Sequence, residues 1–250
     1  MSNAIPYALE VRNLKKAFGG LPVTQDVSLL VRPGERRLII GPNGAGKTTL
    51  FNQITGDFLP NSGEIKLFGQ DVTYLPPHRR AHCGLSRTYQ IITLFTDDTL
   101  EHNVTLGLLG LRPSRWQMWR PLSAYGDLTA EAKRVLQLVG LDHLAGHPVS
   151  EIAYGEKRRV ELAMALAQKP KVLLLDEPLA GLSSSERATV KAQIAAIPRD
   201  TAVIMIEHDM DTALDLAETV TLLNYGKVIV DGARDAVIAD ARTREVYLGN

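Results

Sequence analysis

Residues 36–51 constrain the fold of this chain more than any other stretch. They read Arg-Arg-Leu-Ile-Ile-Gly-Pro-Asn-Gly-Ala-Gly-Lys-Thr-Thr-Leu-Phe, which predicts a buried strand, a glycine-rich loop and the start of a helix. The loop matches the P-loop pattern G-x-x-x-x-G-K-[ST] in full, with Gly41, Gly46, Lys47 and Thr48 at the four defining positions. The alternative is a glycine-rich turn that merely joins strand to helix, and the complete motif disfavours it.

The loop is predicted to bind the phosphates of a nucleotide together with Mg²⁺. Glycines let the backbone N–H groups turn inward, and the N-terminus of the following helix carries about half a positive charge. We expect Lys47 to reach the β- and γ-phosphates and the Thr48 hydroxyl to ligate the metal ion. The predicted nucleotide-binding residues of the loop are Gly41, Pro42, Asn43, Gly44, Ala45, Gly46, Lys47, Thr48 and Thr49.

Composition limits the compartment and the partners of the protein. The 250 residues are enough for one large or two small cores, and 28 basic residues balance 28 acidic ones. Because no net charge attracts polyanions, we expect no nucleic-acid partner. The single cysteine, Cys83, fits a reducing compartment, and the sequence has neither a signal peptide nor an apolar run of about eighteen residues. We therefore expect a cytoplasmic protein that reaches a membrane only by docking onto another chain.

The order of strands and helices predicts an α/β fold with a P-loop core. The apolar runs 172–175 and 201–206 flank a helix expected over 184–196, and this order implies parallel strands. Ser183 and Glu186 have the spacing of a capping box at the start of that helix. Further strands are expected at 7–13, 27–32, 63–68, 219–224 and 227–231. The predicted fold is a mixed sheet with helices on both faces, a small antiparallel β-layer and an inserted helical subdomain.

The helical insert is expected at about residues 76–150, within one domain of residues 1–250 that ends in a polar tail at about 233–250. Inside the insert, Arg112–Pro121 gathers three arginines and two tryptophans between prolines. This cluster could contact a membrane surface or a partner. We favour a solvated loop whose tryptophans pack back onto the insert.

An acidic pair follows the apolar run at 172–175. Asp176 ends this predicted strand, and ligands of open α/β sheets bind at the carboxyl ends of the strands. We expect Asp176 to hold Mg²⁺ and Glu177 to polarise the attacking water as a general base. A purely structural acidic pair is the alternative, and the P-loop upstream disfavours it.

Two further residues are candidates for contact with the nucleotide. His208 ends the next predicted strand in Ile-Glu-His-Asp, where its imidazole could donate to the γ-phosphate as part of the catalytic machinery. A packed or solvated histidine is the alternative, which the strand-end position disfavours. Phe18 precedes Gly19-Gly20 on a predicted loop, where it could stack on adenine or fill the small β-layer.

Together these motifs resemble the nucleotide-binding subunit of ATP-binding cassette (ABC) transporters, over nearly the whole chain. The resemblance implies that the nucleotide is ATP and that Phe18 stacks on its adenine. In that family a glutamine links the metal ion to the membrane partner, and Gln90 of Arg-Thr-Tyr-Gln is its counterpart. The family signature Leu-Ser-Gly-Gly-Gln corresponds to Ile152–Glu156, and the implied nucleotide contacts there are Ala153, Tyr154, Gly155 and Glu156.

The signature departs from the family pattern, because only Gly155 is identical to it. Ala153 replaces the serine that touches the γ-phosphate held by the other subunit, so one charge-assisted hydrogen bond of about 1.5–3 kcal/mol is missing. The helix N-terminus near Gly155 would remain as an anion site. The alternative is a helix that merely begins at Tyr154. Ser183 likewise replaces an aspartate of the family. The sequence therefore does not decide whether the contact that this aspartate usually makes across the dimer is kept.

The segments Ala-Tyr-Gly, Leu-Ala-Gly-Leu, Arg-Thr-Tyr-Gln and Val-Tyr-Leu-Gly resemble the ATPase subunits of branched-chain amino-acid importers. This resemblance implies an ATPase that pairs with a second ATP-binding subunit, identical or paralogous, and drives transmembrane permease subunits from the inner face of the membrane. A periplasmic or extracellular solute-binding protein is a further implied partner. ATPases for lipopolysaccharide extraction share much of the pattern, and a soluble ABC ATPase without a permease is the other alternative.

Overall fold

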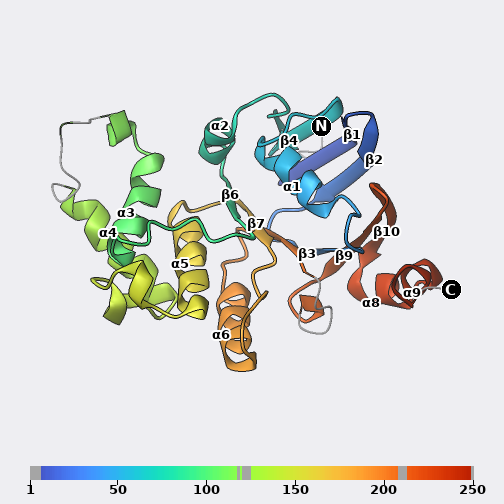
Figure 1. The fold of residues 1–250 in the computed structure, drawn as a ribbon. Helices are drawn as coiled ribbons and strands as arrows, with labels where there is room; N and C mark the ends of the chain where they lie inside the picture. Colours follow the sequence, from blue (N-terminus) through green and yellow to red (C-terminus); the bar gives the residue numbers. More distant parts are fainter. Residues whose placement is uncertain (1–6, 117–118, 120–124, 208–212, 249–250) are drawn as a thin grey trace. The chain divides into compact units, whose positions relative to one another are not determined.

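The computed structural model describes residues 7–116, 119, 125–207 and 213–248. The chain forms two compact units. The first comprises Met1–Arg87, Lys171–Glu177 and Ile197–Asn250, and the second comprises Thr88–Pro170 and Pro178–Ala196. The predicted fold class is confirmed, since a mixed sheet, a separate antiparallel sheet and helices are all present (Figure 1).

A six-stranded sheet forms the centre of the first unit, in the order β10-β9-β3-β8-β7-β6. Strand β3 is parallel to β8 and β9, and β7 is parallel to β8, whereas β10 is antiparallel to β9. The residues of β3, β7 and β8 are buried along their whole length. The apolar runs at 172–175 and 201–206 predict this burial for β7 and β8. The strands are β3 (Arg36–Ile40), β6 (Leu85–Thr88), β7 (Val172–Asp176), β8 (Ala202–Ile206), β9 (Thr219–Asn224) and β10 (Lys227–Ala233).

A four-stranded antiparallel sheet is the second layer of this unit, in the order β2-β1-β4-β5. Helix α1 (Lys47–Thr55) lies next to its strands β1 and β2 (Figure 1). Leu50, Phe51 and Ile54 of α1 are fully buried in one apolar cluster with residues from both sheets. The P-loop helix is therefore held between the two sheets. The strands are β1 (Leu9–Phe18), β2 (Leu21–Val31), β4 (Ser62–Leu67) and β5 (Gln70–Asp71).

A buried arginine caps the C-terminal end of α1 by donating to its last carbonyls. Arg80 of helix α2 (Pro77–His82) is 0% exposed and donates to the carbonyl oxygens of Gln53 at 2.6 Å and Ile54 at 2.7 Å. Two more carbonyls, those of Thr73 and Leu75, accept from it at 2.8 Å each. The bonds to Gln53 and Ile54 satisfy carbonyls that the end of α1 leaves without an intrahelical partner. Burial lowers the pKa of Arg80 to about 10, against the raising effect of Asp57 and Asp71.

Helix α2 thus belongs to the first unit, together with β6 up to Arg87. The insert was expected to begin at about residue 76, whereas the second unit begins at Thr88. Helix α2 lies before this limit because Arg80 attaches it to α1. The predicted tail forms two helices, α8 (Arg234–Ala239) and α9 (Ala241–Leu248). Among the described residues, no helix has both the length and the apolar character needed to cross a membrane.

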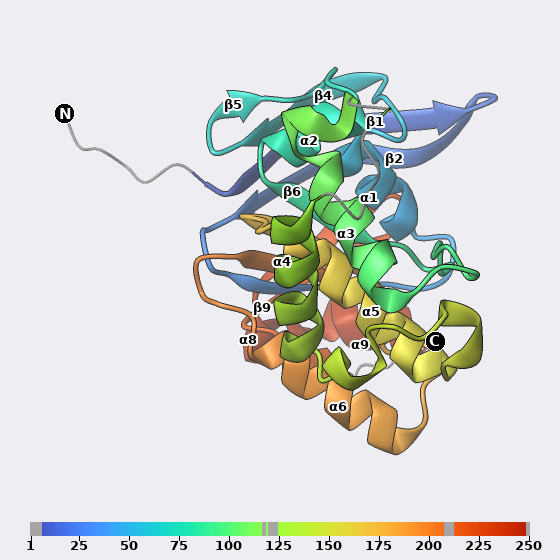
Figure 2. The ribbon, with the colours of Figure 1, turned by 90° about the vertical axis from the view of Figure 1, so that its left-hand side faces the viewer.

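The second unit is helical, and its helices α3, α4 and α5 pack against one another (Figure 2). Leu100, Val104, Leu128, Leu136 and Val160 are among the buried residues of these helices. The described residues of the second unit also include short 3-10 helices at Pro113–Trp116, Asp142–Leu144 and Val149–Glu151. The helices are α3 (Leu100–Gly110), α4 (Gly126–Leu138), α5 (Tyr154–Ala167) and α6 (Ser184–Ala195).

Two sequence predictions about this unit have opposite outcomes. The capping box at the start of α6 is confirmed, because Glu186 accepts from the Ser183 amide at 2.8 Å while the Ser183 hydroxyl accepts from the Glu186 amide. The expectation that both tryptophans of Arg112–Pro121 pack back onto the insert is wrong for Trp119, which is 97% exposed. Residues 117–118 and 120–124 of that region lie outside the described residues.

We predict that Arg80→Ala destabilises the fold by about 3–5 kcal/mol, because three buried carbonyls and the half-buried one of Leu75 lose their donor. Urea denaturation of the purified protein measures the change in the free energy of unfolding. Arg79→Ala is the matched control, since Arg79 is an exposed residue of the same helix and its loss is expected to cost less than about 0.5 kcal/mol. Equal stability of the two variants would contradict the capping role of Arg80.

Candidate functional site

The backbone of the P-loop is fixed by two glycines that have no room for a side chain. A Cβ at Gly41 would lie 2.0 Å from the carbonyl oxygen of Leu223, and one at Gly46 would lie 2.6 Å from that of Val23. Gly46 is also the N-cap of α1 and has a φ of 99°. The loop is therefore packed between β9 and β2, and its path requires glycine at both positions.

The N-terminus of α1 has the features of an anion-binding site. No side chain caps this helix, and its first turn contains no acidic residue. The backbone N–H groups of a first turn have no intrahelical partner, and the helix dipole adds a partial positive charge there. Thr48 is exposed in this turn and Thr49 is half-buried. This arrangement can bind a phosphate group.

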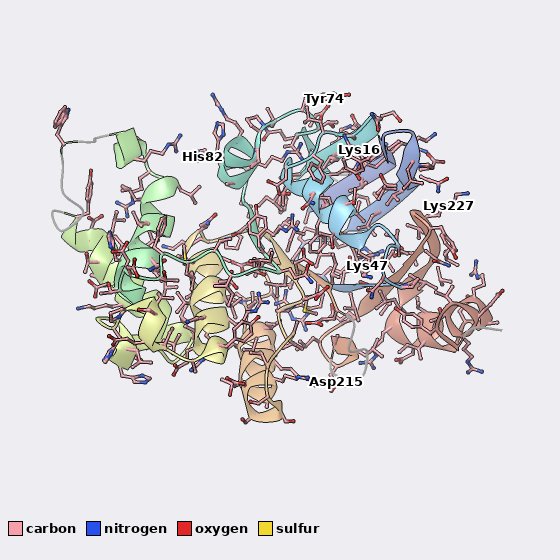
Figure 3. The ribbon with its side chains drawn as sticks, viewed as in Figure 1. Lys16, Lys47, Tyr74, His82, Asp215 and Lys227 are labelled. Atoms are coloured by element: carbon pink, nitrogen blue, oxygen red, sulfur yellow. The ribbon has the colours of Figure 1, made fainter. Side chains whose placement is uncertain are left out.

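Lys47, labelled in Figure 3, bends back over the loop that precedes it, as its hydrogen bonds to that loop require. Its ammonium group donates to the carbonyl oxygens of Gly41 at 2.7 Å and Pro42 at 3.0 Å, and the residue is only 5% exposed. Burial lowers the pKa of Lys47, while the carboxylates of Glu177 and Asp176 raise it. The positive charge of Lys47 is therefore held at the P-loop by the loop itself, within the electrostatic reach of both acidic residues.

Asp176 presents one free carboxylate oxygen at the end of β7. The residue is 0% exposed, and its Oδ2 accepts a hydrogen bond from Arg87 at 2.7 Å. Its Oδ1 is buried and has no hydrogen-bond partner in the described part of the chain. Burial raises the pKa of Asp176, against the lowering effect of the Arg87 hydrogen bond and charge. A buried carboxylate oxygen without a partner fits a hard cation such as Mg²⁺ or its water shell.

Glu177 has a strained backbone. Its φ of 49° is in the left-handed region, which costs a residue other than glycine roughly 1–2 kcal/mol. The amide of Glu177 donates to the carbonyl oxygen of Ile206 at 2.9 Å, which holds the residue against the end of β8. Such strain occurs preferentially at functional sites. His208, two residues beyond Ile206, lies outside the described residues.

Phe18 ends β1 and is 43% exposed. Its ring meets Phe58 edge to face at 5.3 Å, and the ammonium of Lys16 lies 5.1 Å from its centroid. Part of the ring therefore packs within the first unit, and part remains available to a ligand.

A cavity of about 660 Å³ extends from the β1–β2 hairpin to Lys227 at the start of β10. Its wall includes Thr24, which follows Val23, the residue whose carbonyl oxygen packs against Gly46. Lys16 and Lys227 also belong to the wall, and Figure 3 labels both. This cavity thus adjoins the P-loop and has a basic rim. Its lining residues are Lys15, Lys16, Ala17, Gly20, Pro22, Thr24, Gln25, Asp26, Asn61, Ser62 and Lys227.

In the second unit, Arg158 joins Gln90 to helix α5. Its guanidinium donates to the carbonyl oxygens of Gln90 at 2.6 Å and Tyr89 at 3.0 Å, and it pairs with Glu161 at 3.1 Å. Arg158 is 5% exposed, so the guanidinium that makes these contacts is shielded from solvent. The backbone at Gln90 is therefore fixed to helix α5, which begins within the signature segment. This contact was not predicted, because nothing in the sequence distinguishes Arg158 from its basic neighbours Lys157 and Arg159.

The signature segment begins helix α5, with Ala153 as its N-cap. Glu156 accepts from the Ala153 amide at 2.9 Å, which is half of a capping box because alanine has no side-chain acceptor. The Gly155 amide donates to the carboxylate of Glu186, and a Cβ at Gly155 would lie 2.2 Å from its Oε1. Hydrogen bonds from Ser183 and from this amide lower the pKa of Glu186. Glu186 therefore joins the starts of α5 and α6, a contact that its role as a capping residue did not predict.

Comparisons with known proteins agree with this geometry. Residues 24–180 match the family model of the ABC transporter. The chain is 34% identical to the high-affinity branched-chain amino acid transport ATP-binding protein BraF of Pseudomonas aeruginosa, over 96% of this chain and 97% of that protein. It is 33% identical to the corresponding protein LivG of Escherichia coli (strain K12), with the same coverage.

The fold is also similar to that of a solved ATP-binding cassette. The ADP conformation of MJ1267, an ATP-binding cassette of an ABC transporter, superposes with a TM-score of 0.87 and 27% identity. The match covers 98% of this chain and 99% of that one. The chain therefore belongs to the ABC transporter family, as a subunit that binds and hydrolyses ATP.

Proposed function

We propose that ATP binds with its phosphates in the loop Gly41–Thr49 and with Mg²⁺ held by Thr48, Gln90 and Asp176. The uncapped N-terminus of α1, free of acidic residues and built on two packed glycines, is the observation that carries this proposal. The unpartnered Oδ1 of Asp176 supports the metal site. Lys47 leaves its loop carbonyls to contact the β- and γ-phosphates.

The proposed adenine contact is Phe18, whose ring is partly exposed. The cavity with the basic rim lies beside the P-loop and offers space for the rest of the nucleoside. An aromatic face stacks on any base, so this contact adds affinity without strong selectivity for adenine.

Hydrolysis requires a water molecule to attack the γ-phosphate. We assign this activation to Glu177, which follows the metal carboxylate directly and has the strained backbone of many functional residues. His208 is proposed to donate to the γ-phosphate from the end of the next strand. When bound, Mg²⁺ would neutralise charge on the β- and γ-phosphate oxygens.

The complete site is proposed to require a second ATP-binding subunit, identical or paralogous. The segment Ala153–Glu156 of one subunit would face the γ-phosphate bound by the other, through the N-terminus of α5. ATP then favours the closed pair and hydrolysis releases it, so that the transmembrane permease subunits change between their states. Gln90, fixed to α5 by Arg158, is the proposed link between the nucleotide and the permease at the inner face of the membrane.

The proposed cargo is a branched-chain amino acid or a similar small solute, delivered by a periplasmic or extracellular solute-binding protein. The similarity to BraF and LivG over nearly the whole chain supports this class. Lipopolysaccharide extraction and a role without a permease are the alternatives. Neighbouring genes for two permeases and a solute-binding protein would favour import, whereas a gene alone among repair enzymes would contradict it.

Replacing the proposed general base separates hydrolysis from binding. We predict that Glu177→Gln lowers kcat at least about 100-fold while ATP still binds, so an ATP-bound dimer accumulates. Phosphate release and gel filtration with Mg·ATP measure the two effects. Glu64→Gln on strand β4 is the control and is expected to behave like the wild type. Hydrolysis at the wild-type rate without a trapped dimer would refute the role of Glu177.

A second substitution tests the phosphate contact. Lys47→Ala removes a charge-assisted hydrogen bond, so ATP is expected to bind about 10- to 100-fold more weakly. Isothermal titration calorimetry measures this affinity, and circular dichroism establishes that the fold is retained. The control is Lys66→Ala, which removes an equal charge from strand β4 of the antiparallel sheet. If both variants bind ATP equally well, Lys47 does not contact the phosphates.

A further inference from the structure

Arg87 joins three parts of the first unit that the proposed metal site depends on. It belongs to β6, and its Nη2 donates to Oδ2 of Asp176 at 2.7 Å. Its Nη1 donates to Oδ1 of Asn52 on α1 at 2.6 Å and lies 3.3 Å from Oδ2 of Asp57. The two arms of one guanidinium thus connect the end of β7 with helix α1.

These contacts leave the arginine little freedom to move. Its side chain is 4% exposed, and its guanidinium carbon lies 5.5 Å from the centroid of the Phe51 ring. A planar guanidinium presents its donors in a rigid fork, which distinguishes it from the point charge of a lysine. The arginine is therefore suited to fix the direction of a carboxylate as well as to neutralise it.

The direction of the Asp176 carboxylate decides which oxygen meets a ligand. Torsions that end in a carboxylate are broad, so an unrestrained aspartate can exchange its two oxygens. Here Oδ2 is occupied by Arg87, and Oδ1 is the buried oxygen that has no partner among the described residues. The carboxylate is consequently held with Oδ1 available.

Asn52 connects the same arginine to the other proposed metal ligand. Thr48 and Asn52 are four residues apart in α1, so they lie on the same face of the helix one turn apart. By binding Asn52 with one arm and Asp176 with the other, Arg87 holds helix α1, which carries Thr48, against the end of β7, which carries Asp176.

We propose that Arg87 is a positioning residue of the ATPase, which aligns Asp176 with α1 so that Mg²⁺ bound to ATP finds both oxygen ligands in place. This inference rests on the proposed metal site at Asp176. A purely electrostatic role predicts the opposite effect, because the guanidinium has the same sign of charge as Mg²⁺ and its removal would strengthen metal binding.

The test compares the full-length wild type with Arg87→Met and Arg87→Lys. ATP affinity is measured by calorimetry with Mg²⁺ and again with EDTA, and Mn²⁺ affinity is measured by electron paramagnetic resonance in the presence of a non-hydrolysable ATP analogue. We expect both variants to bind Mn²⁺ about tenfold more weakly, the effect typical of residues that orient metal ligands. Their ATP affinity in EDTA is expected to stay within about twofold of the wild type.

Asp57→Asn is the matched control, because Asp57 contacts Arg87 without touching the Asp176 contact. It is expected to leave Mn²⁺ affinity within about twofold of the wild type. Tighter Mn²⁺ binding by Arg87→Met, or an equal loss in Asp57→Asn, would overturn the positioning role. A wild type whose ATP affinity does not respond to Mg²⁺ would instead refute the proposed metal site itself.

Discussion

The fixed position of helix α1 is the constraint on which the first unit depends. At its N-terminus, Gly41 and Gly46 allow the P-loop to pack against β9 and β2. At its C-terminus, Arg80 donates hydrogen bonds to carbonyls that would otherwise be buried without a donor. Between the two ends, three apolar side chains of α1 join the cluster that links both sheets. A helix held in this way keeps its first turn in one orientation, which is what recognition of a phosphate requires.

Arginines with buried guanidinium groups make the long-range connections in both units. Arg80 closes α1, Arg87 connects α1 to Asp176, and Arg158 connects Gln90 to α5. Each donates to oxygens that are far away in the sequence, and Arg80 and Arg158 donate mostly to backbone carbonyls. The planar, multiply donating guanidinium serves this purpose better than an ammonium group, because one side chain satisfies several buried acceptors at once.

The P-loop, the parallel strands and the acidic pair could be predicted because each is a local pattern with a local cause. Gly41 and Gly46 permit a backbone that other residues disfavour, and the apolar runs at 172–175 and 201–206 form strands β7 and β8. The capping box of Ser183 and Glu186 was visible for the same reason. The exposure of Trp119 was not, since the sequence does not specify which surface a loop leaves uncovered.

The sequence by itself determined the family and the α/β class and singled out the candidate site residues, because these follow from spacing along the chain. Only the tertiary structure decided how those residues are supported. Arg87 and Glu186 each bind groups on other elements, and a hydrogen bond between distant segments leaves no periodic or spacing signal in the sequence. The unpartnered oxygen of Asp176 is likewise a property of packing, since it depends on what surrounds the end of β7 in space.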